Sequence, residues 1–247
     1  MLLAVDIGNS SIKFGVFDGE TLVNKSSVPT TAGLTTDTLN SAFENIPDRS
    51  ISSAIACSVV PGINENLKTC LADALGVETL FVNNSFPFGL SIRFDPLEDA
   101  GTDRIVNAFA AAQKYRVPCV ICSFGTATTL DVVNERRELL GGLIAPGLAT
   151  MAKALHLNTA KLPEVDIGPQ SSVINRSTKE AILAGILYTQ IGLVESAVSR
   201  IRNEFGTPMK IVATGGFAQM IADHATVIEI VDENLLLDGL RMLYSRI

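Results

Sequence analysis

The sequence is poor in the residues that build a structural zinc site. Its 247 residues include two histidines and four cysteines, at positions 57, 70, 119 and 122. Cys119 and Cys122 form a C-x-x-C pair, which invites a metal or redox interpretation. However, residues 117–122 are typical of a buried strand, in which side chains three apart point to opposite faces and cannot share a ligand. We therefore expect four buried, inert thiols and no zinc site.

Positive charge is also scarce. The chain has 19 Lys and Arg against 26 Asp and Glu, which gives a net charge of −7 at pH 7. Binding of a nucleic-acid backbone needs a basic surface, so we do not expect nucleic acid as the main partner. The net charge does not exclude an anionic ligand held in a local pocket.

Long apolar runs are missing as well. The longest are the length of single strands and are broken by Gly, Pro or polar residues, so no transmembrane helix and no membrane partner are predicted. Because Met1 leads directly into an apolar run, we expect no signal peptide and a cytoplasmic protein. Contents of 47% hydrophobic and 18% charged residues fit a globular enzyme of one large domain or two ordinary ones.

Two strand-to-turn segments are the most informative features present. Residues 2–5 form an apolar run that leads into Asp6 and a Gly-Asn-Ser-Ser turn, and residues 120–121 lead into a Gly-Thr-Ala-Thr-Thr turn. Turns of this kind expose N–H and hydroxyl groups that bind phosphate oxygens. Neither matches a P-loop or a G-x-G-x-x-G motif, and each alone is also ordinary turn chemistry. Together they predict two loops that close on one polyphosphate from opposite sides, with Asp6 able to hold Mg²⁺ directly or through water.

The predicted elements follow the same order twice. Three strands opened by a Gly-Ser/Thr turn, followed by a helix and a strand, begin at Leu2 and again at Cys119. We therefore predict an α/β fold of two similar halves, residues 1–117 and 118–247, with a ligand cleft between them and a crossover at 83–99. From the apolar spacing, helices are predicted near 36–45, at 64–75, 103–115, 147–155 and 179–204, and from 234 onward. Strands are predicted at 210–214 and at 226–230.

Seven motifs, taken in order, resemble those of the type III pantothenate kinases. They are DIGNSSIKFGVFDG (6–19), SVVPG (58–62), GTDR (101–104), FGTATTLD (124–131), GGLIAPG (141–147), NTAKLP (158–163) and TGG (214–216). The resemblance covers essentially the whole chain. It implies the sugar-kinase, heat-shock ATPase and actin superfamily, with two ribonuclease-H-like (actin-like ATPase) halves and a nucleotide cleft. It also implies a homodimer that phosphorylates pantothenate with ATP, the first step of coenzyme A biosynthesis, using Mg²⁺ and a monovalent cation, K⁺ or NH₄⁺.

The resemblance also implies the site residues. Asp103 matches the catalytic base, the acceptor that transfer to an alcohol requires, although for this residue by itself the better explanation is a carboxylate favoured at a helix N-terminus. Arg104 can clamp a carboxylate or phosphate through two parallel hydrogen bonds. The implied ATP-binding residues are Asp6, Ile7, Gly8, Asn9, Ser10, Ser11, Ile12, Lys13, Gly125, Thr126, Gly215 and Gly216. The implied pantothenate-binding residues are Phe94, Gly101, Thr102, Asp103, Arg104 and Thr178, the last reaching pantothenate from the partner subunit, with residues 181–195 near the dimer interface. A helix-cap role explains the Gly215-Gly216 pair nearly as well.

Several positions depart from the family pattern. Ser123 stands where the family usually has the Asp associated with the monovalent cation, so the dependence on that cation is in doubt. Phe94 replaces a frequent Tyr, and Asn175 and Ser177 replace a more usual Gly and Asn. These changes leave two alternatives open: a non-catalytic accessory or regulatory paralogue, and a superfamily kinase acting on another small alcohol. An active kinase is favoured because Asp6, Asp103, Arg104 and Thr126 are all present.

Overall fold

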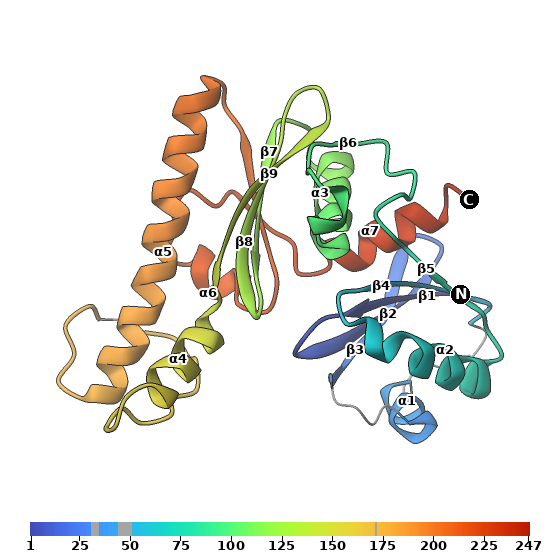
Figure 1. The fold of residues 1–247 in the computed structure, drawn as a ribbon, viewed down its shortest axis with the longest axis horizontal. Helices are drawn as coiled ribbons and strands as arrows, with labels where there is room; N and C mark the ends of the chain where they lie inside the picture. Colours follow the sequence, from blue (N-terminus) through green and yellow to red (C-terminus); the bar gives the residue numbers. More distant parts are fainter. Residues whose placement is uncertain (31–34, 44–50, 171) are drawn as a thin grey trace. The chain divides into compact units, whose positions relative to one another are not determined.

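The chain forms two compact units, each built on a mixed sheet (Figure 1). The computed structural model describes residues 1–30, 35–43, 51–170 and 172–247. The first unit contains Met1–Ala110 and Asn234–Ile247, and the second contains Ala111–Glu233.

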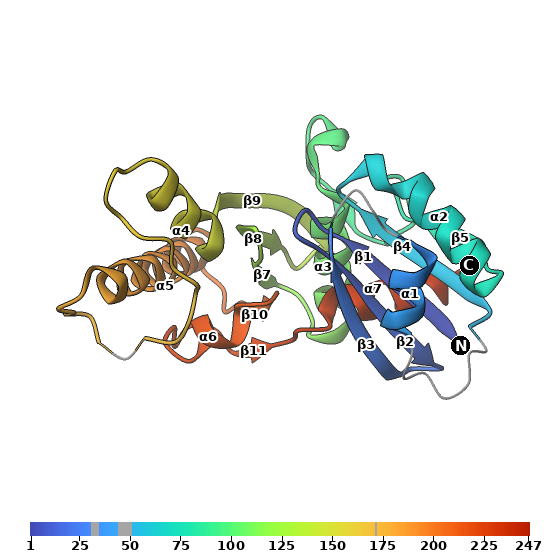
Figure 2. The ribbon, with the colours of Figure 1, turned by 90° about the horizontal axis from the view of Figure 1, so that it is seen from below.

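The first unit has the strand order β3-β2-β1-β4-β5. Its strands are β1 (Leu2–Ile7), β2 (Ser11–Asp18), β3 (Thr21–Pro29), β4 (Ser53–Ser58) and β5 (Thr79–Phe81), and its helices are α1 (Thr36–Ala42), α2 (Pro61–Leu75) and α7 (Leu235–Tyr244). Alternate residues of β1 (Leu3, Val5 and Ile7) share one apolar cluster with side chains of α1 and α2, two helices that lie side by side (Figure 2). Because side chains alternate along a strand, Asp6 faces away from that cluster. α7 packs against β1, β2 and β4.

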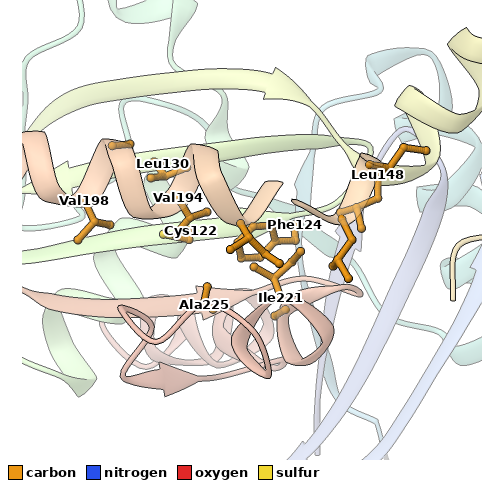
Figure 3. Close-up of a cluster of buried hydrophobic side chains, with 14 of the residues drawn as sticks. Cys122, Phe124, Leu130, Leu148, Val194, Val198, Ile221 and Ala225 are labelled. Carbon is orange, nitrogen blue, oxygen red and sulfur yellow. The ribbon is translucent and has the colours of Figure 1, made fainter. Parts of the chain in front are cut away.

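The second unit repeats this strand order with β9, β8, β7, β10 and β11. Its strands are β7 (Cys119–Phe124), β8 (Ala127–Val133), β9 (Glu138–Pro146), β10 (Lys210–Thr214) and β11 (Ile230–Val231), and its helices are α4 (Leu148–Leu157), α5 (Thr178–Phe205) and α6 (Ala218–Ala222). Figure 3 shows its core, where Val194 and Val198 of α5 meet Cys122 and Phe124 of β7. The connecting segment carries β6 (Ser91–Ile92), a 3₁₀ turn (Leu97–Asp99) and α3 (Thr102–Lys114), whose last residues belong to the second unit.

The two sheets share one topology, which confirms the predicted α/β fold with two halves. In each, the first strand pairs antiparallel with the second and parallel with the fourth: β1 with β2 and β4, and β7 with β8 and β10. In each, the third strand extends the antiparallel side and the fifth extends the parallel side. This is the strand arrangement of a duplicated ribonuclease-H-like unit.

The structure differs from the predicted elements in three places. The last helix, predicted as part of the second half, belongs to the first compact unit because α7 packs on β1 and β4. The strand predicted at 226–230 is misplaced: residues 226–229 lie outside a strand and the pairing with β10 begins at Ile230. The helix predicted near 36–45 ends at Ala42, and its residues 44 and 45 lie outside the described residues.

The prediction that the four cysteines are buried is confirmed. All four thiols are free and buried. Burial raises the pKa of Cys119 and of Cys122 to about 12, so both stay protonated and unreactive at neutral pH.

Candidate active site

The turn between β1 and β2 is held in a fixed shape by hydrogen bonds. The N–H of Gly8 donates to the carbonyl of Ser11 at 3.1 Å. From the end of β3, the Thr30 hydroxyl donates to the carbonyl of Gly8 at 2.7 Å, and the Thr30 N–H donates to the carbonyl of Ser10 at 3.1 Å. Asn9 and Ser10 are therefore presented to solvent at the tip of a rigid turn, which is the arrangement that a phosphate-binding loop needs.

The apolar residues of this loop have a structural role. Ile7 and Ile12 are both fully buried and face each other across β1 and β2. They anchor the base of the turn, so only the backbone of these two predicted ATP-binding residues remains for a ligand.

Asp6 is a buried carboxylate at the end of β1. It is 9% exposed, and Lys13 lies opposite it on β2, with 3.7 Å between Nζ and Oδ2. Burial raises the pKa of Asp6 to about 6, the Lys13 charge opposes this shift, and the charge of Asp103 adds to it. Keeping such a group costs stability, and buried carboxylates of this kind are common at functional sites.

Asp103 lies in the first turn of α3. Burial raises the pKa of its carboxyl, while hydrogen bonding to the Arg104 backbone and the Arg104 charge lower it. Because the charge of Asp103 raises the pKa of Asp6, the first unit brings these two predicted site residues together. Two carboxylates, one buried and one half-buried, whose charges interact can attract a cation and accept a proton.

Arg104 and Gly101 complete the cluster around Asp103. Arg104 is 9% exposed, and its guanidinium carbon is 5.1 Å from the centre of the Phe94 ring, a cation–π contact. The Phe that replaces the family's frequent Tyr thus still offers a ring face to the arginine. A Cβ added to Gly101 would lie 2.6 Å from Oδ1 of Asp103, so a larger residue at this position would displace the carboxylate.

The second predicted phosphate loop connects β7 to β8. The N–H of Gly125 donates to the carbonyl of Ala127 at 3.0 Å, and Thr126 is exposed at the tip. The carbonyl of Thr126 accepts from the N–H of Gly147 at 3.0 Å and from the hydroxyl of Thr150 at 2.6 Å. Hydrogen bonds from the N-terminal end of α4 therefore hold this loop in place.

The two glycines after β10 do different things. Gly215 has a positive φ of 97°, and a Cβ there would lie 2.5 Å from the carbonyl oxygen of Phe124. Only glycine fits at this position, for a reason inside the fold. A Cβ at Gly216 would meet nothing within 4 Å, so the space beside this backbone is open, as approach of a nucleotide would require.

Two further predicted site residues lie in the second unit. Ser123 is half-buried near the end of β7 and pairs with Thr129 and Thr214, so hydroxyls are its neighbours in the sheet. Thr178 is exposed at the first position of α5. Ser177 caps this helix: its hydroxyl donates to the Glu180 carboxylate at 2.7 Å and accepts the Glu180 N–H at 3.3 Å. The replacement of the family's Asn at 177 therefore preserves a helix cap.

The side chains of the candidate site suit a metal ion with few protein ligands better than one coordinated entirely by the protein. Among the described residues, no cluster of three or more His, Cys, Asp or Glu side chains could hold a metal ion. A buried carboxylate with a second one nearby fits Mg²⁺, which keeps several waters and is shared with substrate phosphates. Ser123 itself offers a neutral hydroxyl, as do its sheet neighbours Thr129 and Thr214.

Comparison with known proteins decides the family. The model of the type III pantothenate kinase family matches residues 2–200. The chain belongs to this family. A type III pantothenate kinase of Geobacter sulfurreducens is 41% identical over 252 residues, which cover 100% of this chain and 99% of that protein.

Solved structures agree on the fold. A Campylobacter jejuni protein, provisionally named a Baf family transcriptional activator, has a TM-score of 0.61 and 20% identity over 99% of this chain and 98% of its own. A Listeria monocytogenes protein, provisionally named an N-acetylmannosamine kinase, has a TM-score of 0.53 and 12% identity over 99% of this chain and 98% of its own. At these identities the likeness shows the actin-like ATPase fold alone.

The residues that support the loops from behind were missed by the sequence analysis. Thr30 and Thr150 hold the two predicted phosphate loops through hydrogen bonds that span 22 and 24 residues of sequence. Neither lies in a motif. The only signal in the sequence is a threonine at the edge of a predicted strand or helix, which is too common to be informative.

Proposed function

We propose that this protein transfers the γ-phosphoryl group of ATP to the primary hydroxyl of pantothenate, giving 4′-phosphopantothenate. The observation that carries the proposal is the cluster of buried Asp6 and Arg104 with half-buried Asp103 in the first unit of a type III pantothenate kinase. Phosphoryl transfer depends on positioning and on neutralising charge, and this cluster supplies an acidic group, a proton acceptor and a guanidinium.

Asp103 is the proposed base. Its carboxylate accepts the proton of the attacking hydroxyl, and its raised pKa brings its basicity closer to neutral pH, where a general base works best. Arg104 binds the carboxylate of pantothenate through its planar fork. The Phe94 ring fixes the guanidinium plane for this contact, and Gly101 and Thr102 contribute the backbone of the same loop.

The loops at Gly8–Lys13 and Gly125–Thr126 are proposed to bind the phosphates of ATP, with Gly215 and Gly216 beside the adenosine. Mg²⁺ bound with ATP would neutralise phosphate charge. Asp6 would hold this metal through water, and Lys13 keeps the remaining charge of the pocket balanced. A monovalent cation, K⁺ or NH₄⁺, is proposed to bind at Ser123 with a lower affinity than an Asp at this position would give.

The decisive experiment is an assay of turnover with pantothenate and Mg·ATP. Purified protein with Mg·ATP should form ADP and 4′-phosphopantothenate in equal amounts when pantothenate is added. No product with pantothenate, but product with another alcohol from a panel, would favour the alternative of a kinase with a different acceptor. ATP binding without turnover on any alcohol would favour a non-catalytic paralogue.

The proposed partner is a second copy of this chain. A groove of about 630 Å³ runs along α4 and α5 and is lined by Met151, Leu155 and Ile186 and by the exposed Ala181 and Gly185. α5 is long and apolar enough to cross a membrane by length and composition alone, but more than half of that window is buried within the protein, as in the core helix of a soluble protein. We therefore assign the exposed remainder to the dimer, which also lets Thr178 at the start of α5 serve the partner's substrate, and we place the protein in the cytoplasm.

The proposed dimer can be tested by introducing a charged side chain into the groove. Ala181→Glu puts a carboxylate into the groove at an exposed position and should shift the protein to monomer in analytical ultracentrifugation. Ser199→Glu, exposed near the other end of α5, is the matched control and should leave the dimer intact. A native protein that is already monomeric would end the proposal.

A further inference from the structure

Asn84, a residue outside every family motif, makes the most concentrated set of side-chain hydrogen bonds near the candidate active site. Its amide nitrogen donates to the carbonyl of Leu97 at 3.0 Å and to the carbonyl of Ala100 at 2.7 Å. Its amide oxygen accepts from the hydroxyl of Thr102 at 2.6 Å. One side chain thus uses both polar atoms on a segment 13 to 18 residues away.

The segment that Asn84 holds is the one that delivers Asp103. Leu97–Asp99 is a 3₁₀ turn, and Ala100 that follows it is extended. The carbonyl of Gly101 then accepts the N–H of Arg104 at 3.0 Å and starts α3. Asn84 is hydrogen-bonded to Leu97 in the 3₁₀ turn, to Ala100 after it and to Thr102 at the start of α3. It therefore fixes the direction from which α3 begins.

Asn84 is itself anchored to the sheet that carries Asp6. It comes three residues after β5 ends at Phe81, and the intervening Val82 donates its N–H to the carbonyl of Ala56 on β4 at 2.8 Å. β4 pairs directly with β1. A short path of backbone pairing therefore connects Asp6 to Asn84, and the Asn84 amide connects the sheet to the loop of Asp103.

Packing around this connection is interrupted on one side, although Ala100 itself is buried. A cavity of about 390 Å³ lies beside the pair and is lined by Asn84, Thr102, Ser58, Asn64 and Glu98. Where empty space replaces side chains, little apolar contact resists movement of a loop. On the cavity side, the hydrogen bonds of Asn84, which are partly shielded from water, restrain the loop instead.

We infer that Asn84 is a positioning residue for phosphoryl transfer, which holds Gly101–Arg104 at a fixed place relative to the sheet that bears Asp6. The inference rests on the proposed function. It predicts a selective defect, because the three side-chain hydrogen bonds of Asn84 all go to the loop that carries Asp103, at Leu97, Ala100 and Thr102, and not to the proposed ATP loop.

Steady-state kinetics of Asn84→Ala tests this, with Asn83→Ala as the matched control. Asn83 is exposed, and among the described residues its side chain accepts one hydrogen bond, from the N–H of Ser85. Because small misplacements of reacting groups are costly, we expect Asn84→Ala to lower kcat/KM for pantothenate about 10- to 100-fold. KM for ATP should stay within about twofold, and both parameters of Asn83→Ala should do so as well. An unchanged kcat/KM for pantothenate, or a KM for ATP raised by more than about twofold, overturns the inference.

Hydrogen exchange separates this inference from the proposed function, because it needs no turnover. Amides of residues 100–105 should exchange faster in Asn84→Ala than in the native protein and in Asn83→Ala. If native protein fails to phosphorylate pantothenate, the proposed function falls and the exchange rates alone decide whether Asn84 holds the loop. If Asn84→Ala does not fold, Asn84→Asp decides: it keeps the acceptor for Thr102 but loses both donated bonds, and native kinetics in that variant would refute the inference.

Discussion

The two units place different chemistry at equivalent positions of one strand order. Asp6 is the second-last residue of β1 and lies opposite Lys13 on β2. Ser123 is the second-last residue of β7 and lies opposite Thr129 on β8. The first unit therefore carries a charged pair where the second carries two hydroxyls.

This difference indicates that the cost in stability of a buried functional charge falls on the first unit. In the first unit Asp6 and Arg104 are both buried. Burial disfavours the charged form of Asp6 and raises its pKa to about 6. At the equivalent position of the second unit a neutral Ser123 has no such cost. We expect catalytic losses to concentrate in the first unit and effects in the second to be smaller and specific to cations.

The largest effect should follow from Asp103→Asn. Asn keeps the size and the helix-start geometry but cannot accept the hydroxyl proton, so the rate of pantothenate phosphorylation should fall about 10²- to 10⁴-fold. Asp37→Asn is a matched control, since Asp37 is an exposed first-turn carboxylate of α1. Equal small effects in the two variants would show that Asp103 is only a carboxylate favoured by the helix N-terminus.

Arg104→Lys should come next. Lysine keeps the positive charge but loses the planar fork and the stacking on Phe94. Losing one charge-assisted hydrogen bond should raise KM for pantothenate about 10- to 100-fold, with a smaller change in kcat. An unchanged KM would remove Arg104 from the pantothenate site and weaken the contrast between the units.

Much of the fold was predictable from the sequence because apolar period and turn residues agree. The predicted strand 210–214 matches β10, and the helix predicted at 179–204 is α5 to within a residue at each end. The repeated strand order was predicted because both copies open with glycine and small polar residues. The packing of α7 on β1 and β4 was not predictable, since an amphipathic helix does not specify which sheet it covers.

The candidate site was predictable in its motifs but not in its supports. Asp6 and Asp103 stand in recognisable segments, and the structure places them close enough for their charges to interact. Thr30 and Thr150 act through single long-range hydrogen bonds, which leave no periodic or compositional trace. Long-range contacts of this kind depend on tertiary structure, so local sequence cannot reveal them.

Asp6→Asn should increase stability while it harms function. The pKa of Asp6 is about 6 in the folded state against 3.8 as the reference, so the protonated form is favoured by folding. The associated stability is fully present below pH 3.8 and is lost as the pH rises through about 6. Asn stays neutral, so the variant should exceed the native protein in unfolding free energy by on the order of 1–2 kcal/mol at pH 8, and by much less at pH 4.

Urea denaturation at the two pH values, without nucleotide or metal, measures this difference. Asp18→Asn, at an exposed carboxylate at the end of β2, should show no such pH-dependent gain. A gain of the same size at pH 4 and pH 8, or a loss at pH 8, would mean that ionised Asp6 is not strained by burial.

The smallest and most specific effect should come from giving the second unit the charge it lacks. If an Asp at position 123 supplies the negative charge for a monovalent cation, native Ser123 leaves only neutral oxygens there. Initial rates at fixed Mg·ATP should then respond weakly to K⁺ or NH₄⁺. Ser123→Asp should bring activation by K⁺ at low concentration, whereas the uncharged Ser123→Asn, of similar size, should not. Mg²⁺ dependence should persist in all three forms, because Asp6 and the ATP oxygens remain. Strong saturable activation of the native protein at low K⁺ would contradict this account, because neutral groups around the second phosphate loop would then suffice for the cation and the two units would differ less than their side chains suggest.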